Sequence, residues 1–435
     1  MAKKNGISIA LIMPRSELYQ RRRGFRRSLR YAPLTLTTLA ALTPDFHQAS
    51  IRIVDEGAEE ADYSRLNADL VGITCITGTC TRAYRIADLL RARHIPVVMG
   101  GPHPTLMPEE AKTHADSVVI GLANRSWPAL LEDFTRSALK PYYSDPKASV
   151  ENMPVPRRDL LKRTRYISTK TVQATYGCPH TCEFCVVGIT RPYYIHRPVE
   201  DVVREVESLG SRMVFFLDPS PTENRNYIKS LYRALIPLKI RWMGLATTRI
   251  DEDPELFDLL VRSGCVGLLI GFESVSQKSL ARMGKEFAEV RKYGAFIKKL
   301  HENGIAIQGC FALGTDFDGP SIFEETLEFV IENAMDLPRY TVITPFPRTP
   351  LFDRLNGEGR ILTEDWSKYN CQNVVFRPRN MEPEELQRGL EYIWRESYRP
   401  GNVARRILGS RTRVLYSVIA NLGYVRYSKD LPRYR

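Results

Sequence analysis

Residues 169–350 contain six short apolar runs that alternate with amphipathic stretches of helical length, and this alternation constrains the fold more than any other feature. The runs are KTVQATY, RMVFFLD, IRWMGLATT, CVGLLIGFES, IAIQGCFALG and RYTVITPF. The helical stretches lie near residues 199–210, 223–236, 254–263, 276–303 and 320–334. Strands that alternate with single helices lie parallel, because each crossover returns the chain to the same end of the sheet. Six such units predict a partial (β/α)6, TIM-like barrel, with the chemistry on the loops that follow the strands.

The first 140 residues show a second alternation, which predicts a separate α/β domain. Apolar runs such as GISIALIM, ASIRIVD, ADLVGITCI, IPVVMGG and DSVVIGL alternate with stretches such as AYRIADLLRARH and SWPALLEDF. This pattern predicts a doubly wound, Rossmann-like parallel sheet, which binds ligands at the carboxyl ends of its strands. The turns expected there, TCITGTCT and GGPHPT, contain small and polar residues that let a backbone approach a large ligand closely.

The remaining segments complete the predicted domain organisation. A single hydrophobic core stops growing near about 250–300 residues, so a chain of 435 residues is expected to form more than one domain. Residues 141–168 contain prolines and charges without a sustained period, and we interpret them as a linker. We therefore assign residues 1–140 to the Rossmann-like domain, 169–350 to the barrel and 351–435 to a mostly helical C-terminal extension with a basic tail.

The composition places the protein in a reducing compartment. No apolar run approaches the roughly 20 residues of a membrane span, and the basic start continues into arginines without a signal-peptide cleavage site. Eight cysteines are too few for a disulfide scaffold in a chain of this length. We expect a cytoplasmic protein, in which a tight group of cysteines more often binds metal or takes part in catalysis.

Such a group lies in the segment TYGCPHTCEFC, on the loop expected after the first barrel strand. Cys178, Cys182 and Cys185 are close enough in sequence to suit a soft metal or an iron–sulfur cluster. A structural zinc site takes four ligands, usually in two separated pairs. His180 offers a fourth zinc ligand, but its spacing from Cys178 and the preceding proline place it poorly for a shared tetrahedron. A [4Fe-4S] cluster held by three cysteines would leave one iron open to a substrate or cofactor.

The motif Cys-x-x-x-Cys-x-x-Cys, with Phe184 before its last cysteine, resembles that of the radical S-adenosylmethionine enzymes. The resemblance implies that Cys178, Cys182 and Cys185 hold a [4Fe-4S] cluster whose open iron chelates the amino and carboxylate groups of S-adenosylmethionine. An electron from the cluster then cleaves the sulfonium and yields a 5′-deoxyadenosyl radical. The resemblance also implies a reducing partner such as flavodoxin or ferredoxin.

The same resemblance implies residues that bind S-adenosylmethionine along the barrel. Asp218 and Ser220 follow the second strand, where the family binds the methionine amino group. Arg249 follows the third strand and is expected to meet the carboxylate. Glu273 and Ser274 follow the fourth strand, where they would meet the ribose or the methionine part. Glu273 has a second interpretation, compatible with the first, as an acid at the N-terminus of the predicted helix 276–303.

The N-terminal sheet resembles the cobalamin-binding domain that precedes the barrel in one large radical subclass. The resemblance implies cobalamin contacts from the ligand-facing turns, through Thr74, Thr77, Gly100, Gly101, Pro102 and His103. The chain lacks the Asp-x-His-x-x-Gly motif of mutase-type cobalamin binders, so this motif supplies no histidine to cobalt. After VVIG the subclass usually has an acidic stretch, whereas this chain has LANRS. The alternative is therefore a sheet that has lost cobalamin and only docks a partner.

These resemblances imply an enzyme that methylates or otherwise modifies an unactivated carbon of a small-molecule or lipid-like substrate. In a methyltransferase of this kind, one S-adenosylmethionine methylates cobalamin, and a second supplies the radical that removes a hydrogen atom from the substrate. Related enzymes use the radical for cyclisation or ring contraction, and the motifs do not separate these outcomes. No residue is singled out as a catalytic acid, base or nucleophile.

The formal net charge of +12 is concentrated at the two ends of the chain. Residues 399–435 hold nine lysines or arginines against the single acid Asp430. The tail RRILGSRTRVLYSVIANLGYVRY suits peripheral contact with an anionic membrane, or a helix that caps the open side of the barrel. The charge also permits an RNA-modifying enzyme, although no appended RNA-binding module is visible, and we expect no DNA partner.

Overall fold

A computed structural model describes residues 6–16, 31–45, 48–147 and 149–431. The chain divides into two compact units, Met1–Thr171 with Ile189–Asp201, and Val172–Gly188 with Val202–Arg435. The basic residues at positions 3, 4 and 21–30, and those at 433 and 435, lie outside the described residues. The charge predicted at the two extreme ends is therefore described only in part.

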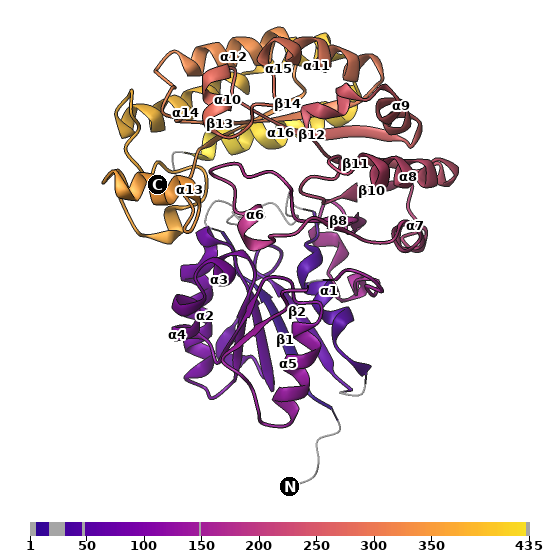
Figure 1. The fold of residues 1–435 in the computed structure, drawn as a ribbon, viewed down its shortest axis with the longest axis vertical. Coiled ribbons are helices and arrows are strands. Elements are labelled where there is room, and N and C mark those ends of the chain that lie inside the picture. The colour runs from indigo at the N-terminus through magenta and orange to yellow at the C-terminus, as the bar shows by residue number, and fades with distance from the viewer. Residues whose placement is uncertain (1–5, 17–30, 46–47, 148, 432–435) are drawn as a thin grey trace. The chain divides into compact units, whose positions relative to one another are not determined.

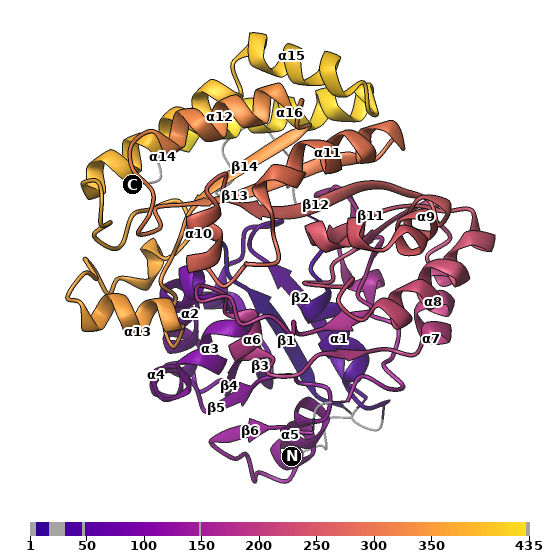
Figure 2. The same ribbon diagram turned by 45° about the horizontal axis from the view of Figure 1, so that its top comes forward.

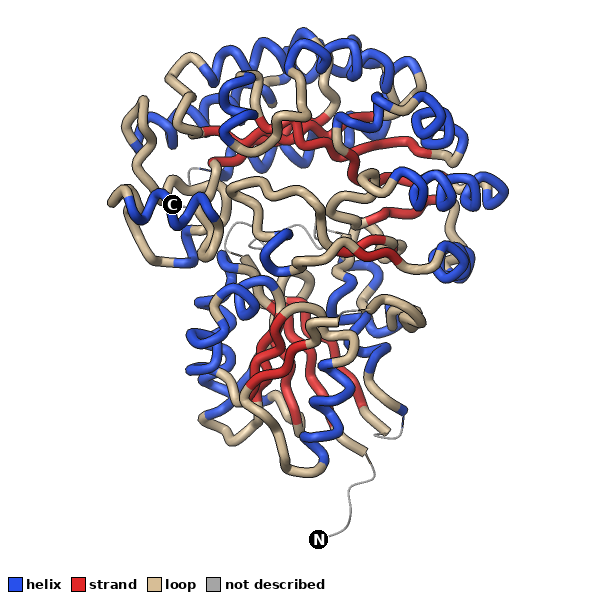
Figure 3. The backbone as a smooth tube through the Cα atoms, in the orientation of Figure 1, coloured by secondary structure: helices blue, strands red, loops and turns tan. Residues whose placement is uncertain are grey.

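The first unit is built on a six-stranded sheet with the order β2-β1-β3-β4-β5-β6, in which all neighbouring strands run parallel (Figure 1). Figure 3 shows these strands between helices of the same unit. The order reverses between β1 and β3, which creates the switch point where doubly wound sheets bind ligands. The strands are β1 Ser8–Met13, β2 Ser50–Asp55, β3 Leu70–Thr74, β4 Val97–Gly100, β5 Ser117–Ile120 and β6 Tyr142–Ser144. The helices are α1 Leu34–Leu42, α2 Cys80–Arg91, α3 Pro102–Leu106, α4 Pro108–His114 and α5 Ser126–Thr135.

The core of this unit confirms the predicted doubly wound fold. The central strands are apolar along their length because parallel strands are covered on both faces. Trp127 of α5 is buried in this core, and its Nε1 donates to Thr43 Oγ1 at 3.1 Å. Gly72 of β3 makes room for the tryptophan, since a Cβ there would lie 3.5 Å from the indole ring and 3.0 Å from Leu11. Strand β6 adds residues of the predicted linker to the edge of the sheet.

The second unit contains a six-stranded open sheet with the order β14-β13-β12-β11-β10-β7, and β10 to β14 run parallel. This arrangement confirms the predicted partial barrel. The strands of the region are β7 Thr171–Val172, β8 Thr175–Tyr176, β9 Ile195–His196, β10 Met213–Phe216, β11 Arg241–Ala246, β12 Cys265–Glu273, β13 Ala306–Leu313 and β14 Leu337–Val342. The helices are α6 Val187–Thr190, α7 Val199–Ser208, α8 Arg225–Leu235, α9 Pro254–Arg262, α10 Gln277–Arg282, α11 Tyr293–Glu302 and α12 Ile322–Glu332.

The predicted helix 276–303 is wrong as a single element. The structure divides it into α10 and α11, and Gly284, with φ of +73°, lies in the intervening loop. Ser276 caps α10, because its Oγ accepts from the Ser279 amide at 3.3 Å. Glu273 belongs to β12 and is not the cap of this helix. The interpretation of Glu273 as a helix-terminal acid is therefore not supported, which leaves its carboxylate for another role.

The C-terminal extension is mostly helical, as predicted. Its helices are α13 Pro350–Gly357, α14 Pro383–Ser397, α15 Pro400–Ser410 and α16 Val414–Asp430. Figure 2 shows α14 and α15 near α12, which contacts both, and α16 contacts α14 and α15. Among the described residues, every helix falls short of the length or the apolar content that a membrane span requires.

Candidate active site

The three cysteines of the predicted cluster motif lie on the loop between β8 and α6. Cys182 is buried, and Cys178 and Cys185 are half-buried. The chain turns back between them, because the Cys185 amide donates to the Cys182 carbonyl at 3.0 Å. Burial raises the pKa of Cys182 to about 11 and also raises the pKa of Cys185. A bound metal would have to offset this effect, since thiolates rather than thiols are metal ligands.

The donor atoms of the cysteine loop are not gathered as tightly as the ligands of a single zinc ion. Among the described residues, only Cys80, His103 and Glu110 bring three Cys, His or carboxylate donor atoms within 4.8 Å of one another. Two thiolates on one zinc ion lie about 3.8 Å apart, given a Zn–S distance of about 2.3 Å. The sulfurs of the cysteine loop are more widely spread than the ligands of one ion. They suit three different irons at the corners of a cluster.

Asp218 lies two residues after β10 and holds the strand that leads into the cysteine loop. Its Oδ1 accepts from the Ala174 amide at 2.8 Å, from the Thr175 hydroxyl at 2.8 Å and from the Thr175 amide. The structure thus places this predicted S-adenosylmethionine ligand where it positions the cysteine loop. Ser220 and Thr222 of the same loop are buried, and Thr222 Oγ1 has no hydrogen-bond partner among the described residues.

Glu223 is a buried carboxylate that the sequence analysis did not single out. Its Oε2 lies 2.9 Å from His180 Nε2 and 3.1 Å from Arg249 Nη1, and its Oε1 accepts from Thr247 Oγ1 at 3.0 Å. Burial alone would raise the pKa of Glu223, but the hydrogen bonds of His180 and Thr247 and the charge of Arg249 lower it below the ordinary value. The His180 ring also stacks on Phe287, with centroids 4.7 Å apart. His180 is therefore directed at Glu223, which joins the cysteine loop to the loops after β10 and β11.

Glu273 ends β12 with φ of +63°, a left-handed conformation that is strained for a residue with a side chain. The register between β12 and β13 shifts between Gly271 and Glu273, and bulges of this kind re-aim side chains next to active sites. Lys285 Nζ donates to Glu273 Oε1 at 2.6 Å. Gly271 makes room for this pair, since a Cβ there would lie 2.3 Å from Glu273 Oε1. Ser274 is buried, and its Oγ accepts from the Ser276 amide at 3.0 Å.

Lys285 brings a buried cation to the cysteine loop. Desolvation lowers the pKa of Lys285, but the Glu273 carboxylate and the thiols of Cys182 and Cys185 raise it overall. The preceding Gly284 has φ of +73°, a conformation that favours glycine, and it lies in van der Waals range of Cys182. An ammonium group and a carboxylate therefore lie together beside the cysteines. They are complementary to the carboxylate and the amino group of an amino-acid ligand.

Ion pairs connect helix α13 to Glu183, an acidic residue within the cysteine motif. We call the contacts of Arg354 and Arg360 with Glu183 and Asp316 the α13 clasp. Arg354 donates to Glu183 at 3.2 Å and to Asp316 at 2.6 Å. Arg360 donates to the second oxygen of Asp316 at 2.7 Å. The Leu351 amide donates to the Glu183 carbonyl at 2.9 Å. The C-terminal extension therefore helps to hold the loop that carries the cysteines.

In the first unit, the predicted ligand-facing turns lie at the carboxyl ends of β3 and β4. Gly101 has φ of +99°, and a Cβ there would lie 2.6 Å from Thr74 Oγ1 and 2.9 Å from the Cys75 carbonyl oxygen. Only glycine fits at this position without displacing backbone. Gly100 ends β4, and Pro102 is the first residue of α3. These residues form the turn at the carboxyl end of β4, which packs against the turn that follows β3.

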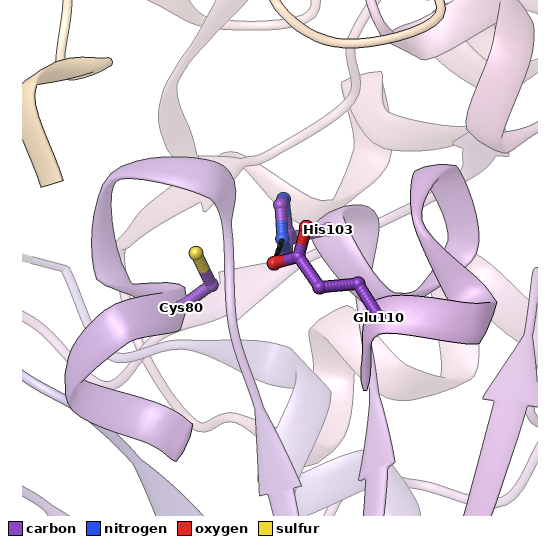
Figure 4. A group of neighbouring side chains, drawn as sticks. All are labelled: Cys80, His103 and Glu110. Carbon is purple, nitrogen blue, oxygen red and sulfur yellow. Dashed lines mark hydrogen bonds and ion pairs between the residues drawn. The ribbon is translucent and has the colours of Figure 1, made fainter. Parts of the chain in front are cut away.

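His103 is fully buried in α3, directly after this turn, and both of its ring nitrogens have partners. Nδ1 lies 3.2 Å from Thr77 Oγ1, and Nε2 lies 3.3 Å from Glu110 Oε1 (Figure 4). The same oxygen of Glu110 accepts from the Tyr84 hydroxyl at 2.9 Å. Burial, followed by the charge of Glu110, raises the pKa of Cys80 to about 12. This group is a hydrogen-bonded cluster, in which His103 has no ring nitrogen left for cobalt.

Comparisons with known proteins identify the family. Residues 172–330 match the family model for the Radical SAM superfamily, residues 32–131 match the B12 binding domain, and residues 349–415 match a domain of unknown function, DUF4070. The chain is 30% identical to bacteriochlorophyllide d C-12(1)-methyltransferase of Chlorobaculum tepidum over 392 residues, which cover 87% of this chain and 85% of that protein. The chain is a B12-binding radical S-adenosylmethionine enzyme.

A second methyltransferase and a solved structure are also similar to the enzyme. It is 32% identical over 392 residues to bacteriochlorophyllide d C-8(2)-methyltransferase of the same organism, with 83% of this chain and 86% of that protein covered. The solved structure of the methyltransferase TsrM from Kitasatospora setae, with cobalamin and a [4Fe-4S] cluster bound, matches with a TM-score of 0.63 and 16% identity. This match covers 81% of this chain and 78% of that chain, and it shows that the two proteins share a fold.

As a member of this family, the B12-binding radical S-adenosylmethionine enzyme uses a [4Fe-4S] cluster, S-adenosylmethionine and cobalamin. The residues present fit these groups. The cysteine loop supplies a three-thiol donor set, and the unpartnered hydroxyl of Thr222 is an available contact for a polar ligand. In the first unit, Gly100 and Gly101 lie at the carboxyl end of β4, the end of a doubly wound sheet at which ligands bind. The match of residues 32–131 favours cobalamin over a sheet that has lost it.

Two residues of the enzyme's site, Glu223 and Lys285, were missed by the sequence analysis. A signal for Glu223 was present, since it is an acid on the loop after the second barrel strand, where the family binds the methionine amino group. Lys285 gives no such signal, because α10 separates it from Glu273 in the sequence. Arg249, predicted to meet the carboxylate, forms ion pairs with Glu223 at 3.1 Å and Glu252 at 3.4 Å.

Proposed function

We propose that this enzyme transfers a methyl group to an unactivated carbon of a cyclic tetrapyrrole. The observation that carries the proposal is the similarity, over most of both chains, to two methyltransferases whose names give bacteriochlorophyllide d as the substrate. The names give two different carbon positions, C-12(1) and C-8(2), and the identities to the two enzymes are 30% and 32%. We therefore propose the substrate class and not one position on the ring.

The bound cofactors would supply the reactive groups, a radical that removes a hydrogen atom from the substrate and a methyl group that replaces it. The residues of the chain hold and orient these groups. Cys178, Cys182 and Cys185 would ligate three irons, which leaves the fourth for the amino acid part of S-adenosylmethionine. Asp218 and the α13 clasp would keep the cysteine loop in place, because they hold its entry strand and Glu183 respectively.

The Glu273–Lys285 pair supports a binding role beside the cluster. Lys285 would neutralise the carboxylate of S-adenosylmethionine, and Glu273 would keep the ammonium charged and directed at it. The buried Ser220 and Thr222 would meet the polar part of the same ligand from the loop after β10. Because Arg249 is already paired, we assign it to the His180–Glu223 network, which positions the cysteine loop.

The test is methyl transfer by the anaerobically purified enzyme, reconstituted with iron, sulfide and cobalamin. The enzyme is supplied with a reductant, bacteriochlorophyllide d and S-adenosylmethionine that carries a trideuterated methyl group. We expect mass spectrometry to find the trideuterated methyl group on the tetrapyrrole, with 5′-deoxyadenosine formed in parallel. The Cys182→Ala variant should form neither product.

Two results would overturn the proposal in different ways. Formation of 5′-deoxyadenosine without any labelled tetrapyrrole, across chlorophyllides that differ in their side chains, would reject the substrate class. A modified tetrapyrrole that carries no deuterium would reject methyl transfer and favour the cyclisation or ring contraction that related enzymes perform.

A further inference from the structure

Over residues 414–422, helix α16 presents polar side chains to the protein and apolar side chains to the solvent. Ser417 and Asn421 are buried, whereas Leu415, Ile419 and Leu422 are 69%, 60% and 65% exposed. The three exposed residues follow the spacing i, i+4, i+7, so they form one stripe along the helix. A surface helix of a globular protein normally has the opposite arrangement. The exposed stripe therefore has no partner within the described part of the chain.

A buried polar network fixes α16 in this orientation. Asn421 Nδ2 donates to the Asp336 carbonyl at 3.1 Å, and Asn421 Oδ1 accepts from Arg406 at 3.0 Å. Arg406 is fully buried and also donates to the carbonyls of Met335 at 2.9 Å, Asp336 at 2.8 Å and Ser397 at 2.9 Å. A hydrogen bond to a charged group contributes about 1.5–3 kcal/mol. Rotation of α16 to bury its apolar stripe would break these bonds and leave the Arg406 charge buried without partners.

The exposed stripe belongs to a larger apolar surface, which we call the outer face of α16. Contiguous exposed apolar surface of this kind marks a site of interaction with a protein or a membrane. The outer face comprises Val414, Leu415, Tyr416, Val418, Ile419 and Leu422. Leu408, on the neighbouring α15, is 72% exposed.

The charges near the outer face identify the kind of partner. Arg405, on α15, and Arg411, in the turn between α15 and α16, are exposed and have no acidic partner among the described residues. The single acid between residues 400 and 431 is Asp430. An apolar face with a cationic border complements an anionic lipid surface, to which each arginine adds about 1 kcal/mol of attraction. A second copy of the chain would instead bring like charges together across the contact.

We propose that the outer face of α16 docks this enzyme on an anionic lipid bilayer. The helix would lie in the plane of the interface, with Leu415, Ile419 and Leu422 at the boundary between headgroups and acyl chains. Since α16 is too short or too polar to span the membrane, this contact is peripheral. The proposal does not depend on the proposed methyl acceptor. It would place the enzyme where water-insoluble substrates accumulate.

The test is flotation of the cluster-loaded protein with lipid vesicles through a sucrose gradient. We expect binding to vesicles of phosphatidylcholine with phosphatidylglycerol, weak binding to phosphatidylcholine alone, and weaker binding as salt is raised. The variant Leu415→Ser/Ile419→Ser/Leu422→Ser should lose about tenfold or more in affinity, and Arg405→Gln/Arg411→Gln should lose affinity and salt dependence together. Leu89→Ser, which changes a leucine that is 43% exposed on α2, is the matched control and should bind normally.

All substituted side chains are exposed, so iron content and circular dichroism should be unchanged and any loss of binding can be assigned to the surface. Binding of the triple serine variant at the affinity of the unsubstituted protein would overturn the proposal. Equal binding to neutral and anionic vesicles would overturn its electrostatic part. A dimer that light scattering detects, and that the triple variant abolishes, would assign the outer face to a second copy of the chain instead.

Discussion

Lys285 Nζ lies 2.6 Å from Glu273 Oε1, and the two side chains are 13% and 14% exposed. Glu273→Gln should leave the lysine as a buried cation without a carboxylate, at a cost of about 3 kcal/mol in the free energy of unfolding. Glu273→Gln/Lys285→Met should recover most of this loss, because neither charge then remains buried. Urea unfolding of the variants measures the effect.

The same variants separate ligand binding from cluster assembly. Affinity for S-adenosylmethionine, measured by calorimetry, should fall in the single and the double variants, since both lose the oriented ammonium or its carboxylate. Iron content should stay at the level of the unsubstituted protein. Loss of iron in Glu273→Gln would assign the pair to cluster assembly, and full affinity in the double variant would exclude it from the binding site.

The assignment of the cluster ligands predicts that two groups of cysteine variants differ in the amount of iron they bind. Cys178→Ala, Cys182→Ala and Cys185→Ala should each lose most of the bound iron, because the cluster needs all three thiolates. Cys265→Ala and Cys310→Ala change cysteines on β12 and β13 and should retain it. Iron and sulfide analysis after anaerobic reconstitution measures this. A full complement of iron in Cys182→Ala would refute the ligand assignment.

The α13 clasp predicts a dependence of stability on pH. Burial raises the pKa of Asp316, but the hydrogen bond of Arg360 and the charges of Arg354 and Arg360 lower it below the ordinary value. Such a carboxylate stabilises the folded protein above its unfolded pKa of about 4, and the contribution is lost as the pH falls from there through the folded pKa. Asp316→Asn should therefore destabilise the protein by about 1–3 kcal/mol at neutral pH.

Urea unfolding between neutral pH and about pH 3 tests this prediction. The stability of Asp316→Asn should fall less steeply below about pH 4 than that of the unsubstituted protein. Asp353→Asn, which changes an exposed acid on α13, is the control and should follow the unsubstituted protein. Parallel curves for Asp316→Asn and the unsubstituted protein would show that the clasp does not contribute.

Bound cobalamin should have no ligand to cobalt from His103, because both of its ring nitrogens have partners within the protein. The paramagnetic cob(II)alamin form should show no nitrogen splitting from an axial imidazole in its electron paramagnetic resonance spectrum. His103→Gln should leave this spectrum unchanged, although it should weaken the cluster with Thr77 and Glu110. Nitrogen coupling that is present in the unsubstituted protein and vanishes in His103→Gln would contradict the prediction.

The features that the sequence determined by itself depend on short separations along the chain. Apolar periodicity within single segments predicted two parallel sheets, since burial on both faces of a parallel strand is a local requirement. The spacing of Cys178, Cys182 and Cys185 predicted the cluster loop, because neighbouring residues on one loop stay close in any fold.

Only the tertiary structure decided which charged and polar groups meet. Glu223 pairs with His180 from a loop 43 residues earlier, and Lys285 reaches Glu273 across the α10 turn. The sequence of α16 did not show that the face with Ser417 and Asn421 is the buried one. The orientation of α16 depends on Asn421, which accepts a hydrogen bond from Arg406 of α15. The Arg406 guanidinium is in turn held by the backbone carbonyls of Met335 and Asp336. Buried polar groups have to be satisfied by partners from anywhere in the fold, so their pairing is a property of the assembled structure and not of any segment.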